Sequence, residues 1–110
     1  MLRELKGTQR LPRVLAAIVD GTGTAAIREG ATDFTLADGG TGVYTLTITK
    51  PFARKPVVVV TCATTDCYAE TVDASNTASS IAILTKNNAD AATDAVFHVM
   101  VIGWDSATSY

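Results

Sequence analysis

The sequence contains little charge of either sign. Charged residues make up 18% of its 110 residues, and nine lysines and arginines against eleven aspartates and glutamates leave a formal net charge of −2. Proteins that bind nucleic acid usually carry a basic surface, so this balance argues against nucleic acid as a partner. Hydrophobic residues reach 47%. A small domain of that composition is expected to bury part of its apolar surface against other subunits.

Long hydrophobic runs are also missing. No apolar stretch approaches the roughly 20 residues that a membrane-spanning helix requires, so we expect no membrane as a partner. The opening residues, MLRELKGTQRLPRV, are charged and contain no apolar segment of the kind found in a secretory signal. The sequence therefore predicts neither a membrane span nor export by the general secretion route.

Histidine and cysteine are too few for a closed metal site within one chain. His98 is the only histidine, and Cys62 and Cys67 are the only cysteines, whereas a structural zinc ion takes about four such ligands. We therefore expect no metal and no cofactor. The two cysteines are predicted to be free, partly buried thiols, and a disulfide that closes the short loop between them is the alternative.

No arrangement of residues typical of an enzyme is present. The Gly-x-Ser-x-Gly motif of hydrolases is absent. The stretches DGTGT (20–24) and DGGTG (38–42) do not open a helix and lack the lysine of a phosphate-binding loop, so both are predicted to be hairpin turns. His98 lies among apolar residues, where a histidine is usually packed and hydrogen-bonded or in contact with another subunit. We therefore expect a protein without catalytic activity.

The sequence is rich in strand patterns. GGTGVYTLTITKPFARKPVVVV (39–60) begins with a strand in which Tyr44, Leu46 and Ile48 share one face and threonines occupy the other. Pro51 ends this strand, because proline has no N–H to donate to a neighbouring strand. The run Val57–Val60 is β-branched and apolar on both faces, which predicts a central strand covered on both sides.

The rest of the chain shows short strands about ten residues apart, separated by turns rich in glycine, aspartate and asparagine. Without a convincing long helix, this spacing predicts an all-β protein built as an antiparallel sandwich or barrel. We expect an N-terminal arm at 1–13 and a single β-sandwich domain at 14–110. The arm is either mobile or ordered only on another subunit.

The last predicted strand, Val96–Trp104, is apolar on both faces. Phe97, Val99 and Val101 alternate with the residues of the opposite face. A strand buried on both sides of so small a sandwich needs a second covering layer, and other copies of the chain are its simplest source. The predicted oligomer interface therefore consists of Val96, His98, Met100, Ile102 and Trp104.

Two stretches resemble small β-sandwich proteins of tailed bacteriophage virions. They are GGTGVYTLTITKPFARKPVVVVT at 39–61 and FHVMVIGWDS at 97–106. In that group a strand of the Gly-x-Tyr-x-Leu type runs through a Pro-Phe turn into a valine-rich strand, and the final strand ends in a Gly-Trp-like motif. The Met-Leu-Arg opening, followed by a strand and an Asp-Gly turn, is also similar to theirs.

The resemblance implies a non-enzymatic role in the virion. It points to a head decoration or cement protein, or to a knob on a fibre or spike, made in the host cytoplasm and assembled as a homotrimer. The partner would be the major capsid protein or another virion protein. In this interpretation the arm grips the shell, through Leu2, Arg3, Leu5, Arg10 and Leu11.

A weaker resemblance is to the H-type lectin domain, which also has a Pro-Phe turn between strands and a tryptophan near its end. The two resemblances together imply a sandwich of the jelly-roll or H-type lectin kind. The second also implies an alternative function, a receptor- or carbohydrate-binding tip that uses loops such as 86–94 and Trp104 to hold a glycan.

Overall fold

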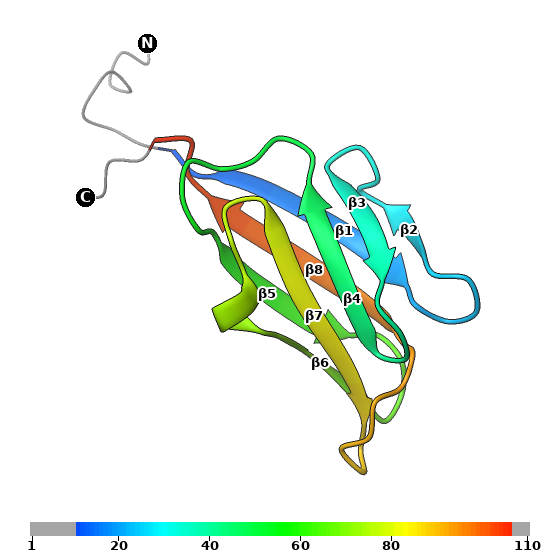
Figure 1. The fold of residues 1–110 in the computed structure, drawn as a ribbon. Coiled ribbons are helices and arrows are strands. Elements are labelled where there is room, and N and C mark those ends of the chain that lie inside the picture. Colours follow the sequence, from blue (N-terminus) through cyan, green and yellow to red (C-terminus); the bar gives the residue numbers. More distant parts are fainter. Residues whose placement is uncertain (1–10, 107–110) are drawn as a thin grey trace.

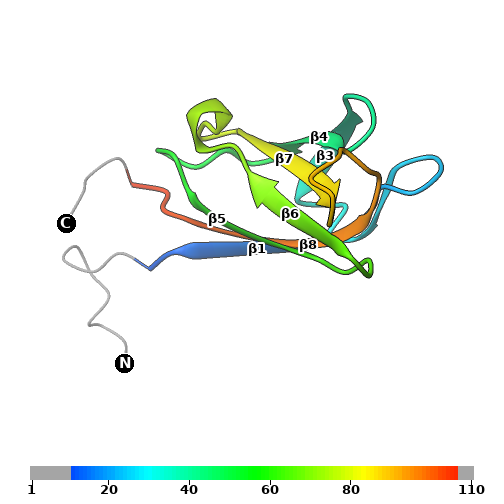
Figure 2. The same cartoon turned by 90° about the horizontal axis from the view of Figure 1, so that it is seen from below.

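The computed structural model describes residues 11–106 and shows two four-stranded antiparallel sheets packed face to face (Figures 1 and 2). Sheet A consists, in spatial order, of β2 (Ala26–Glu29), β1 (Arg13–Asp20), β8 (Val96–Gly103) and β5 (Val57–Cys62). Sheet B consists of β3 (Phe34–Asp38), β4 (Val43–Ile48), β7 (Ser80–Asn87) and β6 (Cys67–Thr71). A 3₁₀ turn, η2 (Asp73–Ser75), follows β6. The predicted all-β antiparallel sandwich is confirmed.

The core lies between the sheets and is filled by every second residue of the strands. In β4 the three residues predicted to share one face are all buried. In β8 the three residues predicted to lie on the face opposite His98 are buried as well. The rings of Tyr44 and Phe97 meet across the two sheets with their centroids 5.1 Å apart. The buried members of these two strands are Tyr44, Leu46, Ile48, Phe97, Val99 and Val101.

Tyr44 also connects the core to two loops at one end of the sandwich. Its hydroxyl donates a hydrogen bond to the carboxylate of Asp94, at 2.8 Å, and lies 3.4 Å from the carbonyl oxygen of Gly21. Burial and Asp94 raise the pKa of Tyr44 to about 12, so the hydroxyl keeps its proton. A Cβ at Gly21 would overlap the Tyr44 hydroxyl, which explains the glycine in the β1–β2 turn.

Val57–Val60 forms a strand, as predicted, but the prediction that this strand is central and covered on both faces is wrong. β5 is the edge strand of sheet A, and Val57 and Val59 point to solvent, whereas Val58 and Val60 pack against the core. A β-branched run indicates a strand, but it does not say whether a second layer covers the outer face. The two inner strands of the sheet are instead β1 and β8, and β8 lies between β1 and β5.

The two Gly-rich stretches are hairpin turns, as predicted, because each joins a pair of antiparallel neighbours, β1 with β2 and β3 with β4. Two boundaries differ from the expectation. β8 ends at Gly103, so Trp104 follows the strand, and β1 begins at Arg13, so the last residue assigned to the arm belongs to the sandwich.

Arg13 joins three segments where β1 begins. Its guanidinium is paired with Asp105, at 2.8 Å, and donates a hydrogen bond of 2.9 Å to the carbonyl oxygen of Lys50. Its Cζ atom also lies 4.2 Å from the centroid of the Phe52 ring. Phe52 in turn covers Gly103, where a Cβ would come within 2.6 Å of the ring. Arg13 thus links β1, the β4–β5 connection and the residues after β8.

We expect the Asp105→Asn variant to lose stability at neutral pH but not in acid. Arg13 holds the pKa of Asp105 below its ordinary value of 3.8, so the carboxylate stabilises the fold above that value. This contribution is lost as the pH falls through the lower folded pKa. Denaturant unfolding at pH 7 and at about pH 3 measures the difference between the variant and the unchanged protein.

The control is the same substitution in an Arg13→Gln background, where Asp105→Asn should have little effect at either pH. A pH-independent effect of Asp105→Asn would contradict the ion-pair explanation.

Candidate functional site

The candidate site is the outer face of sheet A, which faces away from the core. Three strands contribute to it in antiparallel register, so that their side chains form rows across the sheet. The rows are Val14–Ile102–Val57, Ala16–Met100–Val59 and Ile18–His98–Thr61. These nine residues and Val96, ten in all, are called the outer face below.

The alternation of β1, β8 and β5 creates this face. Leu15, Ala17 and Val19 of β1 enter the core, so the residues between them must point outward. β8 follows the same alternation, and its central position places its outward residues in the middle of the face.

The outer face is unusually apolar for a protein surface. Val14, Val57, Val59 and Met100 are 56%, 51%, 49% and 40% exposed, and they are four of the seven large hydrophobic residues exposed within 11–106. None of the outer-face residues is an acid, a lysine or an arginine. Contiguous exposed patches of this kind typically mark interaction surfaces.

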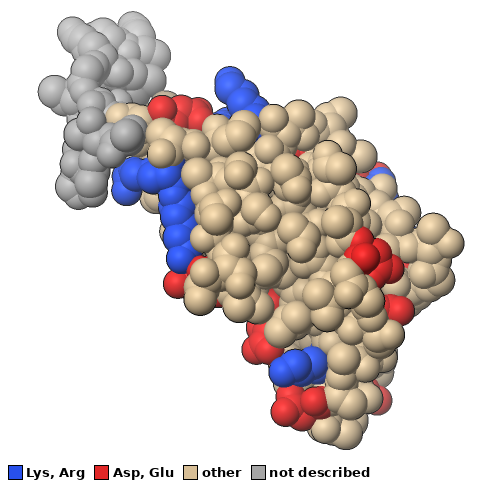
Figure 3. Space-filling model, viewed as in Figure 1, with Lys and Arg blue, Asp and Glu red and all other residues tan. Residues whose placement is uncertain are grey.

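The opposite side of the sandwich provides a contrast. The outward residues of sheet B include Thr35, Thr45, Thr47 and Ser80, whose hydroxyls are well suited to water. Lys86 and Glu70 form an ion pair there at 3.4 Å. Figure 3 shows the molecule from this side, with acidic and basic side chains around the rim of an uncharged centre. Val43 and Tyr68 also point outward from sheet B, 39% and 40% exposed, but they lie among threonine, serine and charged residues, so the larger uncharged apolar group is on sheet A.

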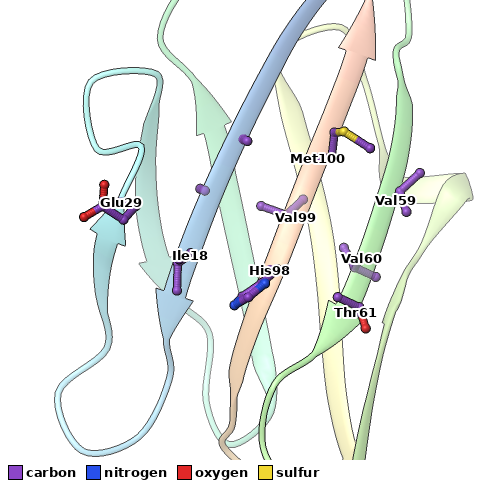
Figure 4. A pocket seen from close by; sticks show the side chains of 10 residues that line it. Ile18, Glu29, Val59, Val60, Thr61, His98, Val99 and Met100 are labelled. Atoms are coloured by element: carbon purple, nitrogen blue, oxygen red, sulfur yellow. The ribbon is translucent and has the colours of Figure 1, made fainter.

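A hollow of about 410 Å³ lies on the outer face, over the row that contains Met100 and the row that contains His98 (Figure 4). Ala16 is the smallest side chain of the middle row, and larger neighbours such as Ile18, Met100 and Val59 rise around it. The lining of the hollow is mostly apolar but includes Glu29, Thr61 and His98, and its apolar part is a shallow depression suited to apolar side chains.

His98 is the only outer-face residue with an ionisable side chain. It lies between Ile18 and Thr61 in its row, and Glu29 of β2 adjoins Ile18 at the end of the same row. Ile18 therefore separates the imidazole from the nearest carboxylate in the row. Within 11–106 no three histidine, cysteine or acidic residues are grouped so that they could hold a metal ion.

The structure places four of the five predicted interface residues on one surface. Val96, His98, Met100 and Ile102 all alternate to the outer side of β8. Trp104 lies beyond the strand, half-buried, with the guanidinium carbon of Arg54 5.2 Å from its ring centroid. Sequence reasoning missed Val14, Ala16, Val57 and Val59, because only strand pairing brings β1 and β5 to the sides of β8.

The residues predicted to grip a shell mostly lie outside the described part of the chain. Leu2, Arg3, Leu5 and Arg10 are not described, and Leu11, which is, is 68% exposed. The loop predicted at 86–94 is shorter than expected, because β7 continues to Asn87.

Cys62 and Cys67 are half-buried free thiols at the end of β5 and the start of β6. The Cys62 sulfur lies 3.7 Å from the carbonyl oxygen of Val96. Desolvation and the neighbouring Cys62 raise the pKa of Cys67, which keeps it in the weakly reactive thiol form at neutral pH.

No protein-family model, curated protein or solved structure matches this chain. Within residues 11–106 no helix has the length and apolar character needed to span a membrane.

Two neighbouring residues of β8 should respond differently to the same substitution. Met100→Lys places a charge on the exposed outer face and should change the free energy of unfolding of the isolated chain by no more than about 0.5 kcal/mol. Val99→Lys places the charge in the core and should prevent folding. Urea unfolding monitored by circular dichroism at low protein concentration measures both effects, and strong destabilisation by Met100→Lys would contradict the assigned orientation.

Proposed function

We propose that this protein is a non-enzymatic structural component of a bacteriophage virion, a capsid decoration or cement protein. It assembles as a symmetric homo-oligomer through the outer face of sheet A and attaches to the major capsid protein or another virion protein. The observation that carries this proposal is the uncharged apolar outer face. The resemblance of 39–61 and 97–106 to small phage β-sandwich proteins supplies the virion context.

The size of the face supports self-association. Each strand residue covers roughly 16 Å² of a flat sheet, so the whole outer side of sheet A, with the four residues of β2 at the margin of the outer face, gives about 400 Å² per copy. The relief of the side chains increases this area. Pairing two such faces therefore removes about 1,000 Å² from water, which is the lower limit for a specific interface.

The energetics favour association that is moderate in strength. If two-thirds of this area is apolar, its burial contributes about 16 kcal/mol at about 25 cal/mol per Å². The loss of translational and rotational freedom opposes this by about 4–15 kcal/mol. The resulting free energy of association is small and favourable. This is expected for a subunit that is also held in place by contacts with a particle surface.

The arm has a defined point of departure in this proposal. β1 begins at Arg13, which pairs with Gly103 and is fixed by Asp105, so the chain enters sheet A at a firmly held end. An arm that begins there can reach a shell while the β1–β2 turn and the β7–β8 loop at the opposite end face away. Shell attachment is assigned to the arm, and contact between copies to the outer face.

The oligomeric state is the first measurement. Light scattering across a dilution series should give a mass that is a multiple of the 11.5 kDa subunit, and three subunits is the number that the resemblance implies. Val59→Lys should shift the mass to that of one subunit, because it would bury a charge in an apolar contact. A single-subunit mass for the unchanged protein at every concentration would contradict the proposal and favour the glycan-binding alternative.

Removal of residues 1–10 should abolish attachment to the shell while the sandwich still folds and associates. The deletion leaves Arg13 and its contacts in place. Co-sedimentation with particles that lack the protein measures attachment, and light scattering confirms that association is kept. Full decoration of particles by the shortened protein would show that the arm does not make the shell contact.

A further inference from the structure

β1 and β8 carry the outer-face residues in matched pairs. The register places Val14 opposite Ile102, Ala16 opposite Met100 and Ile18 opposite His98. Residues of a pair lie side by side in the same row, about 5 Å apart at their Cα atoms. The middle pair combines a long flexible side chain with the shortest side chain on the face.

This pairing has a consequence for contact between two copies. A two-fold axis that lies in the plane of the face, between β1 and β8 and close to their direction, exchanges the two strands. β8 of one copy then lies on β1 of the other. The two-fold rotation leaves the position along the strand unchanged. Each outer-face residue of β8 in one copy therefore lies opposite the β1 residue of the other copy that belongs to the same row.

We propose that two copies of this chain pair through their outer faces about such an axis, with Met100 of each inserted into the hollow over Ala16 of the partner subunit. Met100 is exposed and flexible enough to adapt to the hollow. The hollow, of about 410 Å³, has room for it. Packed sheets usually cross at about 30°, so the fit is closest in this middle row and loosens toward the outer rows.

The chemistry of the face favours a second copy over a different partner. An acidic or basic protein would find no ion-pair partner among outer-face residues that carry no acid, lysine or arginine. At the margin of the face Arg28 pairs with Asp20 within the chain, and Glu29 lines the edge of the hollow with β1 between it and His98. Apart from Glu29 at the edge of the hollow, the contact surface carries no acid, lysine or arginine, so two copies can stack without bringing like charges into its centre.

The symmetry differs from the trimer that the resemblance implies. When one face stacks on the same face of another copy, the contact is closed after two copies. The inference rests on the proposed self-association, but it makes a narrower claim. It names the symmetry axis and the two residues that meet across it.

An exchange of the two side chains tests the inference. Ala16→Met should weaken the dimer roughly tenfold or more, because two methionines would then compete for the same hollow. Met100→Ala should also weaken it roughly tenfold, because the hollow is left empty. The double variant A16M/M100A restores one long and one short side chain at the contact, and its dissociation constant should return to within roughly threefold of the original.

Ala82→Met is the matched control, because Ala82 points outward from sheet B and the substitution adds the same side chain. It should leave the dissociation constant unchanged. Sedimentation equilibrium gives the constants, and circular dichroism checks that each variant is folded.

The outcomes separate the inference from the proposed function. A protein that never associates would overturn both. Two results would overturn the two-fold arrangement alone. One is a dimer that the single substitutions weaken and that A16M/M100A does not restore, and the other is a stable trimer. Recovery of the dimer only in the double variant is the result that we expect.

Discussion

The antiparallel pairing of β8 with both β1 and β5 is the constraint on which the rest of the structure depends. It places β8 at the centre of sheet A, so its inward residues fill the core and its outward residues form the middle of the outer face. Phe97 meets Tyr44 of the other sheet, while Met100 meets solvent. Because side chains alternate along a strand, the same eight residues supply the core on one side and the surface of the proposed association on the other.

Local patterns predicted much of the fold because they reflect burial directly. The alternation of Tyr44, Leu46 and Ile48 was correct, and so was the division of β8 into two faces. Val57–Val60 was misread because an apolar residue on the outer side of an edge strand is indistinguishable, in one sequence, from one beneath a second layer. The position of a strand within its sheet depends on pairing with distant residues, which strand periodicity does not encode.

The candidate site was predicted only where a single strand defines it. The four β8 residues could be grouped from their spacing, but Ala16 and Val59 join Met100 only through strand register across more than 40 positions of sequence. Trp104 was assigned to the same surface by extending the alternation one residue past the end of the strand. There the backbone turns toward Ala53, whose N–H bonds the Trp104 carbonyl oxygen.

The contrast between the two outer faces indicates that the apolar one does not arise from the needs of the sandwich. Both sheets contribute inward residues to one core, yet sheet B mixes threonine and serine with Val43 and Tyr68 outside, where sheet A carries mainly valine, isoleucine and methionine. Outward methyl groups add nothing to a core that they do not touch, and their exposure to water is unfavourable. Pairing with another copy removes that exposure and, by mass action, adds to the stability of the folded chain. In the proposed dimer, association and folding share β8 but depend on different residues of it, so each can be changed without the other.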